Sequence, residues 1–377
     1  MKGNDTVFFG IMKFLPKEKF DFFVKQQNGD KWAKKITSWD ILINVLSGQL
    51  SGELTLRGIT DSQYGLKKEL AQLSSVSLPR SSLSDACNNR PYNSFLEALN
   101  YLIRVSHRKI RRDLKGVIKI LDSTPIQLRG VGYDWTKSNY RIQGIKTHVV
   151  FYLEQSIPGD ITFSDANVND IEEGKKITLL ENTTYCFDRA YYDFRWWAAI
   201  ASKRSRFVTR LKSNTPYKVL KRNSKTHSDI KHDWVIEVVS KKSGKLNMPL
   251  RHIKVKRDTG GYVEIISNDL ESPAEEIAAI YRARWKIELF FKWIKGKLKI
   301  KHFISKSENG VKIQIIIAMI AYVLLRLTQE KYKLSKSTLS SLTRIIKRHL
   351  YASKSIGRLL NKFKILQHKG TAREVMI

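Results

Sequence analysis

The sequence predicts an α/β protein in which a helical N-terminal region precedes a sheet-containing core, and a β-rich insertion interrupts that core. Three observations support this fold class. Apolar residues recur at helical spacing over residues 1–108, short apolar runs typical of strands begin at Val117, and a series of alternating strands is followed by a helix start near Pro273. With 377 residues, the chain is long enough for two or three units with cores of their own.

Residues 1–108 are predicted to be mostly helical. Thr37 is suited to cap a helix whose apolar residues lie on one side, and Gly52 is expected to end it. After Pro79, the polar segment 81–89 is compatible with the recognition helix of a helix-turn-helix DNA-binding domain. A plain helical bundle fits the same pattern equally well.

Residues 109–212 have the pattern of an α/β unit. A helix is predicted at 194–203, and short strands are predicted at 117–121, 146–155, 183–187 and 207–211. The first strand is expected to end at Asp122 and the third at Asp188, so each places a carboxylate directly after an apolar run.

Residues 213–271 alternate between apolar and polar side chains and are predicted to form a β-meander. Its strands are expected at 234–240, 250–257 and 261–267, with turns at Ser243-Gly244 and Thr259-Gly260-Gly261. The meander lies between two α/β segments, so the sequence predicts an insertion.

The core is expected to resume over residues 272–330. Ser272, Pro273 and Glu275 form a helix-start signal, because Ser caps helices, Pro fits the first helical position and Glu follows three residues after the cap. This helix is expected to run through Lys295, and a buried helix at 311–328 closes the core. The remainder, 331–377, is expected to be a basic and weakly helical tail.

The charge balance points to a polyanionic partner. Lys and Arg number 68 against 35 Asp and Glu, a formal charge of +33, and after Tyr281 there are 23 basic and only 4 acidic residues. Such a field suits a protein that sits on nucleic acid. The apolar run 313–327 is short and contains Gln314 and Arg326, so a buried helix is favoured over a membrane span. Without a signal peptide, the protein is expected in the cytoplasm, with no membrane partner.

Several classes of chemistry lose support. Two cysteines, Cys87 and Cys186, cannot form a disulfide framework or a Cys-based zinc site. The sequence has no Walker phosphate loop, no complete dinucleotide fingerprint, no His-Glu-x-x-His motif and no Gly-x-Ser-x-Gly elbow. Nucleotide hydrolysis, hydride transfer, zinc hydrolysis and serine acyl transfer are therefore disfavoured.

Three carboxylates stand out in so basic a chain: Asp122, Asp188 and Glu288. Two acids at strand ends and one from a packed helix can converge on one point, where hard oxygen ligands suit divalent cations. Two such ions can activate an attacking oxygen and stabilise the leaving oxygen of a phosphodiester. Ordinary ion pairs with neighbouring Lys or Arg remain the alternative interpretation of each acid.

The third acid has cationic neighbours on its own helix. Tyr281, Arg284, Glu288 and Lys295 share one stripe at helical spacing, with Lys292 beside them. The opposite side is expected to bury Trp285, Leu289, Phe290 and Trp293 against the sheet. A carboxylate flanked by Arg and Lys fits a metal ligand beside phosphate-binding cations, whereas a solvated face with weak ion pairs fits the spacing as well.

The pattern Tyr281-x-x-Arg284-x-x-x-Glu288-x-x-x-x-x-x-Lys295 resembles the Tyr-Arg-Glu-Lys signature of bacterial DDE transposases of the insertion-sequence-4 family. Asp122 in ILDSTPIQL and Asp188 in DRAY are similar to the first and second catalytic Asp regions of that family. The resemblance covers about residues 115–328, and residues 1–108 are similar to the helical DNA-binding domain of one branch.

The resemblance implies a ribonuclease H-like core whose metal ligands and catalytic residues are Asp122, Asp188 and Glu288. Mg²⁺ is the implied cofactor, with Mn²⁺ as a substitute. The partners are double-stranded DNA, as transposon ends and target, and a second copy of the chain in the DNA complex. Residues implied or suggested to contact DNA are Tyr281, Arg284, Lys292, Lys295, Arg189, Arg210 and Lys212.

The sequence therefore predicts a transposase that binds the terminal inverted repeats of its element, cuts there and joins the 3′-OH ends to target DNA. Two alternatives stay open. A nuclease of the same fold would hydrolyse DNA without joining it, and a catalytically inactive protein of transposon origin would bind DNA without cutting.

Overall fold

The structure is a computed structural model that describes residues 5–53, 55–107, 117–136, 142–224, 226–240, 244–298, 303–334 and 337–374. The predicted boundary at 108/109 and Ser243 of a predicted turn lie outside these residues. The chain divides into two compact units. We call them the helical unit (Met1–Arg108, Leu128–Lys137, Trp293–Ile377) and the sheet unit (Lys109–Gln127, Ser138–Lys292).

The helical unit is built around one long buried helix, α12 (Glu308–Lys331). Within the described residues it is the one helix long and apolar enough to cross a membrane, but 89% of its apolar stretch is buried inside the protein. The predicted core helix is thus confirmed. Around it pack, among others, α1 (Val7–Met12), α3 (Ser38–Ser51), α6 (Arg80–Asn89), α7 (Tyr92–His107) and α13 (Leu339–His349). The unit also contains α2 (Lys17–Gln26), α4 (Leu56–Ser62), α5 (Lys67–Gln72), the short η1 (Asp134–Thr136) and α14 (Ile356–Glu374).

Local signals explain where these helices begin and end. Thr37 caps α3 by accepting a hydrogen bond from the backbone of Asp40, whose carboxylate in turn accepts from the Thr37 backbone. Gly52 ends α3 with a left-handed φ of 82°, which glycine adopts without steric cost. The expected weakly helical tail was wrong, because α13 buries Leu342 and Ile346 as an apolar face within the helical unit.

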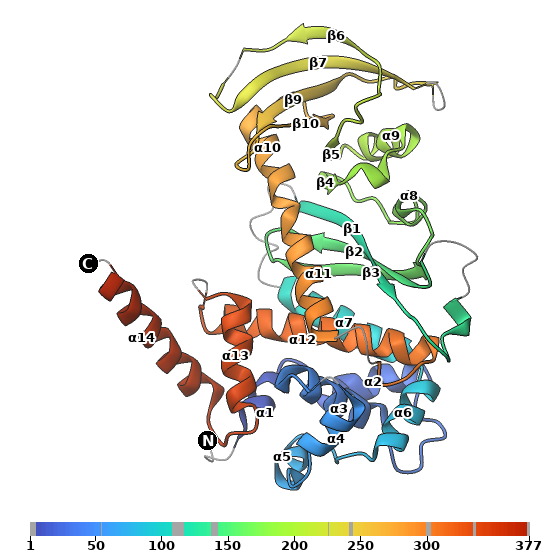
Figure 1. Ribbon diagram of the computed structural model, residues 1–377, viewed down its shortest axis with the longest axis vertical. Coiled ribbons are helices and arrows are strands. Elements are labelled where there is room, and N and C mark those ends of the chain that lie inside the picture. The colour runs from blue at the N-terminus through green and yellow to red at the C-terminus, as the bar shows by residue number, and fades with distance from the viewer. Residues whose placement is uncertain are drawn as a thin grey trace. The chain divides into compact units, whose positions relative to one another are not determined.

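The sheet unit contains one mixed sheet with the order β3-β2-β1-β4-β5-β10-β9-β7-β6, and β8 pairs with β7 beside this path. β1, β4 and β5 are parallel, whereas the other pairings are antiparallel. The predicted meander therefore continues the core sheet through the β5–β10 pairing. Figure 1 shows this succession of strands. The strands are β1 (Val117–Gln127), β2 (Gly144–Tyr152), β3 (Ile157–Asp165), β4 (Thr183–Phe187), β5 (Arg206–Arg210), β6 (Tyr217–Arg222), β7 (Ile230–Ser240), β8 (Gly244–Lys245), β9 (Leu250–Lys256) and β10 (Tyr262–Ser267).

Helices cover both faces of the core sheet. On one face, α10 (Ala274–Ala283) and α11 (Trp285–Leu298) pack, with the Phe290 ring 5.5 Å from that of Phe151 on β2. The other face holds α8 (Asp170–Gly174), η2 (Arg189–Tyr191) and α9 (Phe194–Ser202). There Trp197 stacks on Phe207 at 4.9 Å, in a core of large aromatic side chains.

The predicted helix from Ser272 to Lys295 is divided into two. At Arg284 the backbone makes three-residue hydrogen bonds, from its N–H to Tyr281 and from the Ile287 N–H to its carbonyl, so α10 ends and α11 begins. The expected Ser272 cap was also wrong, since its hydroxyl donates to Asp269 and Pro273 occupies the cap position.

The expected buried face of this helix was wrong in part. Trp285 is 59% exposed and Leu289 is 51% exposed. The face that α11 buries instead consists of Ile287, Phe290, Phe291 and Ile294, which recur at spacings of three and four. Trp285 and Leu289 are thus left on the solvent side.

Candidate active site

Two of the predicted acids come directly after paired residues of neighbouring parallel strands. β1 and β4 pair in register up to Leu121 and Phe187; Asp122 follows within β1, and Asp188 follows the end of β4 and caps η2. The prediction that Asp122 ends its strand was wrong, because β1 continues to Gln127. Among the described strands, β1 beyond Leu121 pairs only with β2, and Pro125, which has no backbone N–H, lies in this one-sided part of the strand.

Glu288 reaches the same site through Arg284. The Arg284 guanidinium lies between two carboxylates, with Nη2 2.5 Å from Oε1 of Glu288 and Nη1 3.4 Å from Oδ2 of Asp122. The side chains of Arg284 and Asp122 are only 17% and 16% exposed. A fork of this geometry can neutralise two acids at once.

The carboxyl group of Asp122 has an unusual proton affinity. Burial raises its pKa from 3.8 to about 7, and the negative charges of Asp188 and Glu288 act in the same direction. The Ser123 backbone N–H, which donates to Oδ1 at 2.8 Å, and the Arg284 charge oppose the rise. A carboxyl poised near neutrality among other acids is typical of a functional site.

The donor chemistry fits a divalent cation, but the ligands are not gathered in this structure. Among the described residues, no three His, Cys, Asp or Glu side chains form a ready-made metal cage. Arg284 instead supplies the positive charge between Asp122 and Glu288. Hard carboxylate oxygens that need a cation are the groups that Mg²⁺ and Mn²⁺ bind.

A hydrogen-bonded cluster supports the Asp122 strand from the opposite face of the sheet. Ser123 follows Asp122, so its side chain points the other way, and its hydroxyl donates to Asp170 at 2.8 Å. Lys146 Nζ donates to the same carboxylate at 3.0 Å and to the Val168 carbonyl. Sequence reasoning missed this cluster, because its members come from three separate segments that only the folded sheet brings together.

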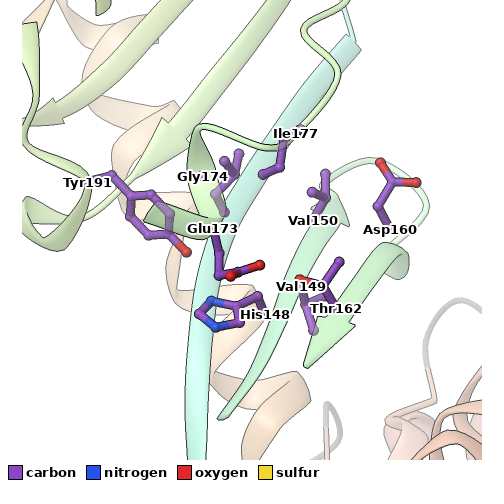
Figure 2. A pocket seen from close by; sticks show the side chains of 10 residues that line it. His148, Val149, Val150, Asp160, Thr162, Glu173, Gly174, Ile177 and Tyr191 are labelled. Atoms are coloured by element: carbon purple, nitrogen blue, oxygen red, sulfur yellow. The ribbon is translucent and has the colours of Figure 1, made fainter. Parts of the chain in front are cut away.

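A small cavity, lined in part by Leu121, Val149, Val150 and Ile177, lies next to this cluster. Its volume is about 20 Å³, and in Figure 2 the His148 ring, the Glu173 carboxylate and the Tyr191 hydroxyl point toward one another within it. Burial lowers the pKa of His148, and its Nδ1 has no hydrogen-bond partner among the described residues. The cavity is far smaller than a nucleotide, so it is not a substrate pocket.

A cationic groove of about 380 Å³ adjoins the acids. Its lining includes the apolar Val255, Val263 and Ile265, and also Tyr281, whose ring centre lies 5.9 Å from the Arg284 guanidinium. Burial raises the pKa of Tyr281, while the charges of Arg284 and Arg210 lower it. The cations that line the groove are Arg210, Lys256, Arg257, Arg282 and Arg284. Lys256, Arg257 and Arg282 were missed, because nothing in the spacing of a β-turn predicts which helix it will face.

The other predicted DNA-contacting cations do not line this groove. Arg189 is exposed in η2, directly after Asp188, and Lys212 Nζ lies 4.5 Å from the centre of the Tyr192 ring. Lys292 is exposed on α11, one turn after Glu288. Lys295 follows on the same helix, in the part that belongs to the helical unit. The structure thus links Asp122 and Glu288 through Arg284, places Asp188 directly after the strand beside that of Asp122, and lines one groove with Arg284, Tyr281 and Arg210.

An α/β core with clustered carboxylates beside a cationic groove fits the class of metal-dependent enzymes that cut and join DNA. Residues 113–324, more than half of the chain, match the family described as "Transposase DDE domain". The chain belongs to this family and is a transposase. Residues 3–73 match a second family, described as a domain of unknown function.

Curated relatives agree with this assignment. A putative transposase of Sinorhizobium fredii is 37% identical over 78% of this chain and 84% of its own length. A probable transposase for insertion sequence element IS5377 of Geobacillus stearothermophilus is 29% identical over 68% of this chain and 70% of its own length. The resemblance to insertion-sequence transposases stated from the sequence is thereby confirmed.

A solved structure shares the overall fold. It is the piggyBac transposase in a synaptic complex with hairpin DNA, with a TM-score of 0.51 and 11% identity over 95% of this chain and 81% of that chain. At 11% identity, this similarity supports a shared fold and nothing further.

Proposed function

We propose that Asp122, Asp188 and Glu288 are the catalytic carboxylates of this transposase and the ligands of its divalent ions, with Mg²⁺ as the working metal and Mn²⁺ as a substitute. The observation that carries the proposal is the Arg284 bridge between Asp122 and Glu288, beside an Asp188 that follows the neighbouring parallel strand. Divalent ions bound there supply activation of the attacking oxygen and stabilisation of the leaving oxygen.

The proposed reaction has two phosphoryl-transfer steps. Water first attacks the phosphodiester at each element end, which breaks the bond to the flanking strand and leaves a 3′-OH. That 3′-OH then attacks a phosphodiester of target DNA, so one P–O bond forms as another breaks. The chain's contribution is to bind the terminal inverted repeats, to orient the scissile phosphate and to supply the three carboxylates.

The groove cations are proposed to hold DNA phosphates beside the acids. Arg284 and Arg210 line the groove next to Tyr281, and guanidinium groups bind phosphate oxygens in a bidentate manner. Further phosphate contacts are proposed for Arg189, Lys212, Lys292 and Lys295. Arg284 would then exchange its carboxylate partners for phosphate when metal and DNA bind.

The division of the chain is proposed as the sequence predicts it. Residues 1–108 form a helical DNA-binding domain, 109–212 and 272–330 form the two parts of a ribonuclease H-like core, 213–271 form the insertion, and 331–377 form a basic C-terminal segment. The order β3-β2-β1-β4-β5, with β1, β4 and β5 parallel, supports such a core. We further propose a homodimer in the DNA complex, because two ends must be held together, and a cytoplasmic, nucleoid-associated enzyme.

The test is end cleavage by wild type and Glu288→Gln on a plasmid that carries the element's ends. Wild type is expected to cut in Mg²⁺ and not in EDTA, and Glu288→Gln is expected to lose cleavage at least 100-fold. End binding by the variant should stay within a few-fold of wild type. Equal loss of binding and cleavage would make Glu288 a structural residue and would contradict the proposal.

A further inference from the structure

An exposed tryptophan stands among lysines in the loop between α2 and α3. We call residues 31–36 the Trp32 loop. Trp32 is 83% exposed, although large aromatic side chains are mostly buried in folded proteins. The exposed lysines beside it are Lys31, Lys34 and Lys35. Lys31 Nζ lies 5.2 Å from the centre of the Trp32 ring, within the range of a cation–π contact.

The Trp32 loop is fastened at both ends by one ion pair. Asp30, directly before it, accepts hydrogen bonds from the Ser38 backbone N–H and hydroxyl at the start of α3. Arg90 Nε lies 2.9 Å from Asp30, and Arg90 Nη2 donates to the Ile36 carbonyl at 2.9 Å. A loop held in this way loses little conformational freedom when it binds a partner.

The anchor also places the loop next to the predicted recognition helix. Arg90 is the residue that ends α6 (Arg80–Asn89), so Asp30 and Ile36 contact the C-terminal end of that helix. All of these residues belong to the helical unit, and the Arg90 side chain connects the loop to the end of α6. A surface that approaches α6 at this end therefore also meets the Trp32 loop.

The chemistry of the loop selects the partner. Lysines contact phosphates and release counterions from DNA, and an apolar side chain can wedge against base edges in the minor groove. The total charge of +33 would oppose docking of a second copy on this basic loop. Double-stranded DNA satisfies the lysines and the ring together.

We propose that the Trp32 loop is a DNA-contact element that grips the duplex of the element's end, with Trp32 packed into a groove and the three lysines on the flanking phosphates. This inference rests on the proposed function, because the duplex is the transposon end. It adds a contact remote in sequence from the carboxylates and distinct from α6. The loop thus contributes to end binding and takes no part in the chemistry.

The experiment measures binding of the full chain to a labelled end duplex in EDTA, where no cutting interferes. Trp32→Ala is expected to weaken binding at least tenfold, and Trp32→Phe less than threefold. The matched control is Tyr64→Ala, since Tyr64 is 93% exposed in the same unit, near Lys67 and Lys68. The control should bind within twofold of wild type. Thermal unfolding should be unchanged in all three variants, because surface substitutions cost little stability.

Two further readouts identify the contact itself. Replacing the three loop lysines by Ala should make the fall of the log binding constant with log salt concentration less steep, by about 2–3 in slope, at about 0.9 per phosphate contact. Acrylamide quenches the fluorescence of exposed tryptophans, so the extra quenching of wild type over Trp32→Phe measures the exposure of Trp32. Added duplex should cover Trp32 and reduce this extra quenching.

Three results would overturn the proposal. Wild-type affinity in Trp32→Ala would remove the loop from the DNA interface while leaving the proposed function intact. Loss of self-association with unchanged DNA binding would identify a protein contact instead. If the wild type itself fails to bind end duplex, the proposed function fails together with the loop.

Discussion

The carboxylate of Asp122 and the guanidinium of Arg284, 162 positions apart in the sequence, lie 3.4 Å from each other. The second arm of the same guanidinium contacts Glu288 at 2.5 Å, one helical turn further along the chain. Arg284 is therefore the residue that ties the central strand β1 to the helix pair α10–α11. A cation that holds two proposed metal ligands must compete with the metal for them.

This competition predicts the behaviour of Arg284→Gln in the absence of metal. Without the guanidinium, Asp122 and Glu288 lose their common counter-ion, and the free energy of unfolding should fall by about 3 kcal/mol at neutral pH. Mg²⁺ should restore more stability to the variant than it adds to wild type. Thermal unfolding with and without Mg²⁺ measures both effects, and an equal response of the two proteins would argue against competition.

Asp122 predicts a pH dependence with a defined sign. Its folded-state pKa of about 7 lies above the ordinary value of 3.8, so between these values the folded chain binds more protons than the unfolded chain. Stability should therefore fall as pH rises through this window and level off above it. Between pH 5 and pH 7 wild type should lose about 2 kcal/mol relative to Asp122→Asn, from about 1.4 kcal/mol per pKa unit.

Denaturant unfolding of the two metal-free proteins at pH 5, 6, 7 and 8 measures this difference. A constant difference across the series would mean that Asp122 titrates normally. The Asn side chain keeps the shape of Asp without its titration, so it is the matched reference.

The buried pair Arg251–Asp233 predicts a large loss of stability. Arg251 contacts both carboxylate oxygens of Asp233 at 2.5 Å, and it donates to the carbonyls of Leu270 and Ser272, just before α10. Arg251→Met leaves a buried carboxylate unpaired and should cost about 3–5 kcal/mol in denaturant unfolding. Arg206→Met is the control, because Arg206 is 48% exposed and its pair with Asp269 should contribute no more than about 1 kcal/mol.

Two helical glycines predict opposite responses to a methyl group. A Cβ at Gly48 in α3 would lie 2.4 Å from Ile59 Cγ1 and 2.8 Å from the Glu53 carbonyl, so Gly48→Ala should destabilise by about 1–3 kcal/mol. Gly296 in α11 has no atom of the described residues within 4 Å of that position. Gly296→Ala should stabilise by about 0.5–1 kcal/mol, through reduced backbone freedom of the unfolded chain. Shifts of the same sign in thermal unfolding would contradict the packing described.

The sequence predicts the interior of the sheet better than its edges. The strand 183–187 was predicted with its observed bounds because its side chains form a continuous apolar run. Sequence reasoning missed β3 and β6, which are the two edge strands of the sheet. β3 contains Pro158 and Gly159, and β6 is almost wholly exposed, so neither shows the apolar pattern of a buried strand.

The acids could be selected from sequence, but their arrangement could not. A spacing of four places Arg284 beside Glu288 on any helix, and this pair was foreseeable. The approach of Arg284 to Asp122 depends on how α10 and α11 lie on the sheet. Within α11, two sets of apolar residues follow helical spacing, one with Trp285 and Leu289 and one with Ile287, Phe291 and Ile294, and only the second set is buried. Spacing alone does not choose between them, which is why Trp285 and Leu289 were assigned to the wrong face.

We propose that the three carboxylates form one site that joins DNA as well as cutting it. The most direct test supplies a pre-cut element end with a free 3′-OH and a target plasmid, in Mg²⁺, to wild type and to Asp188→Asn. Wild type is predicted to join the end to the plasmid, and Asp188→Asn is predicted to bind the end without joining it. Joining by the variant, or hydrolysis of DNA by wild type without any joined product, would contradict this assignment of the three carboxylates.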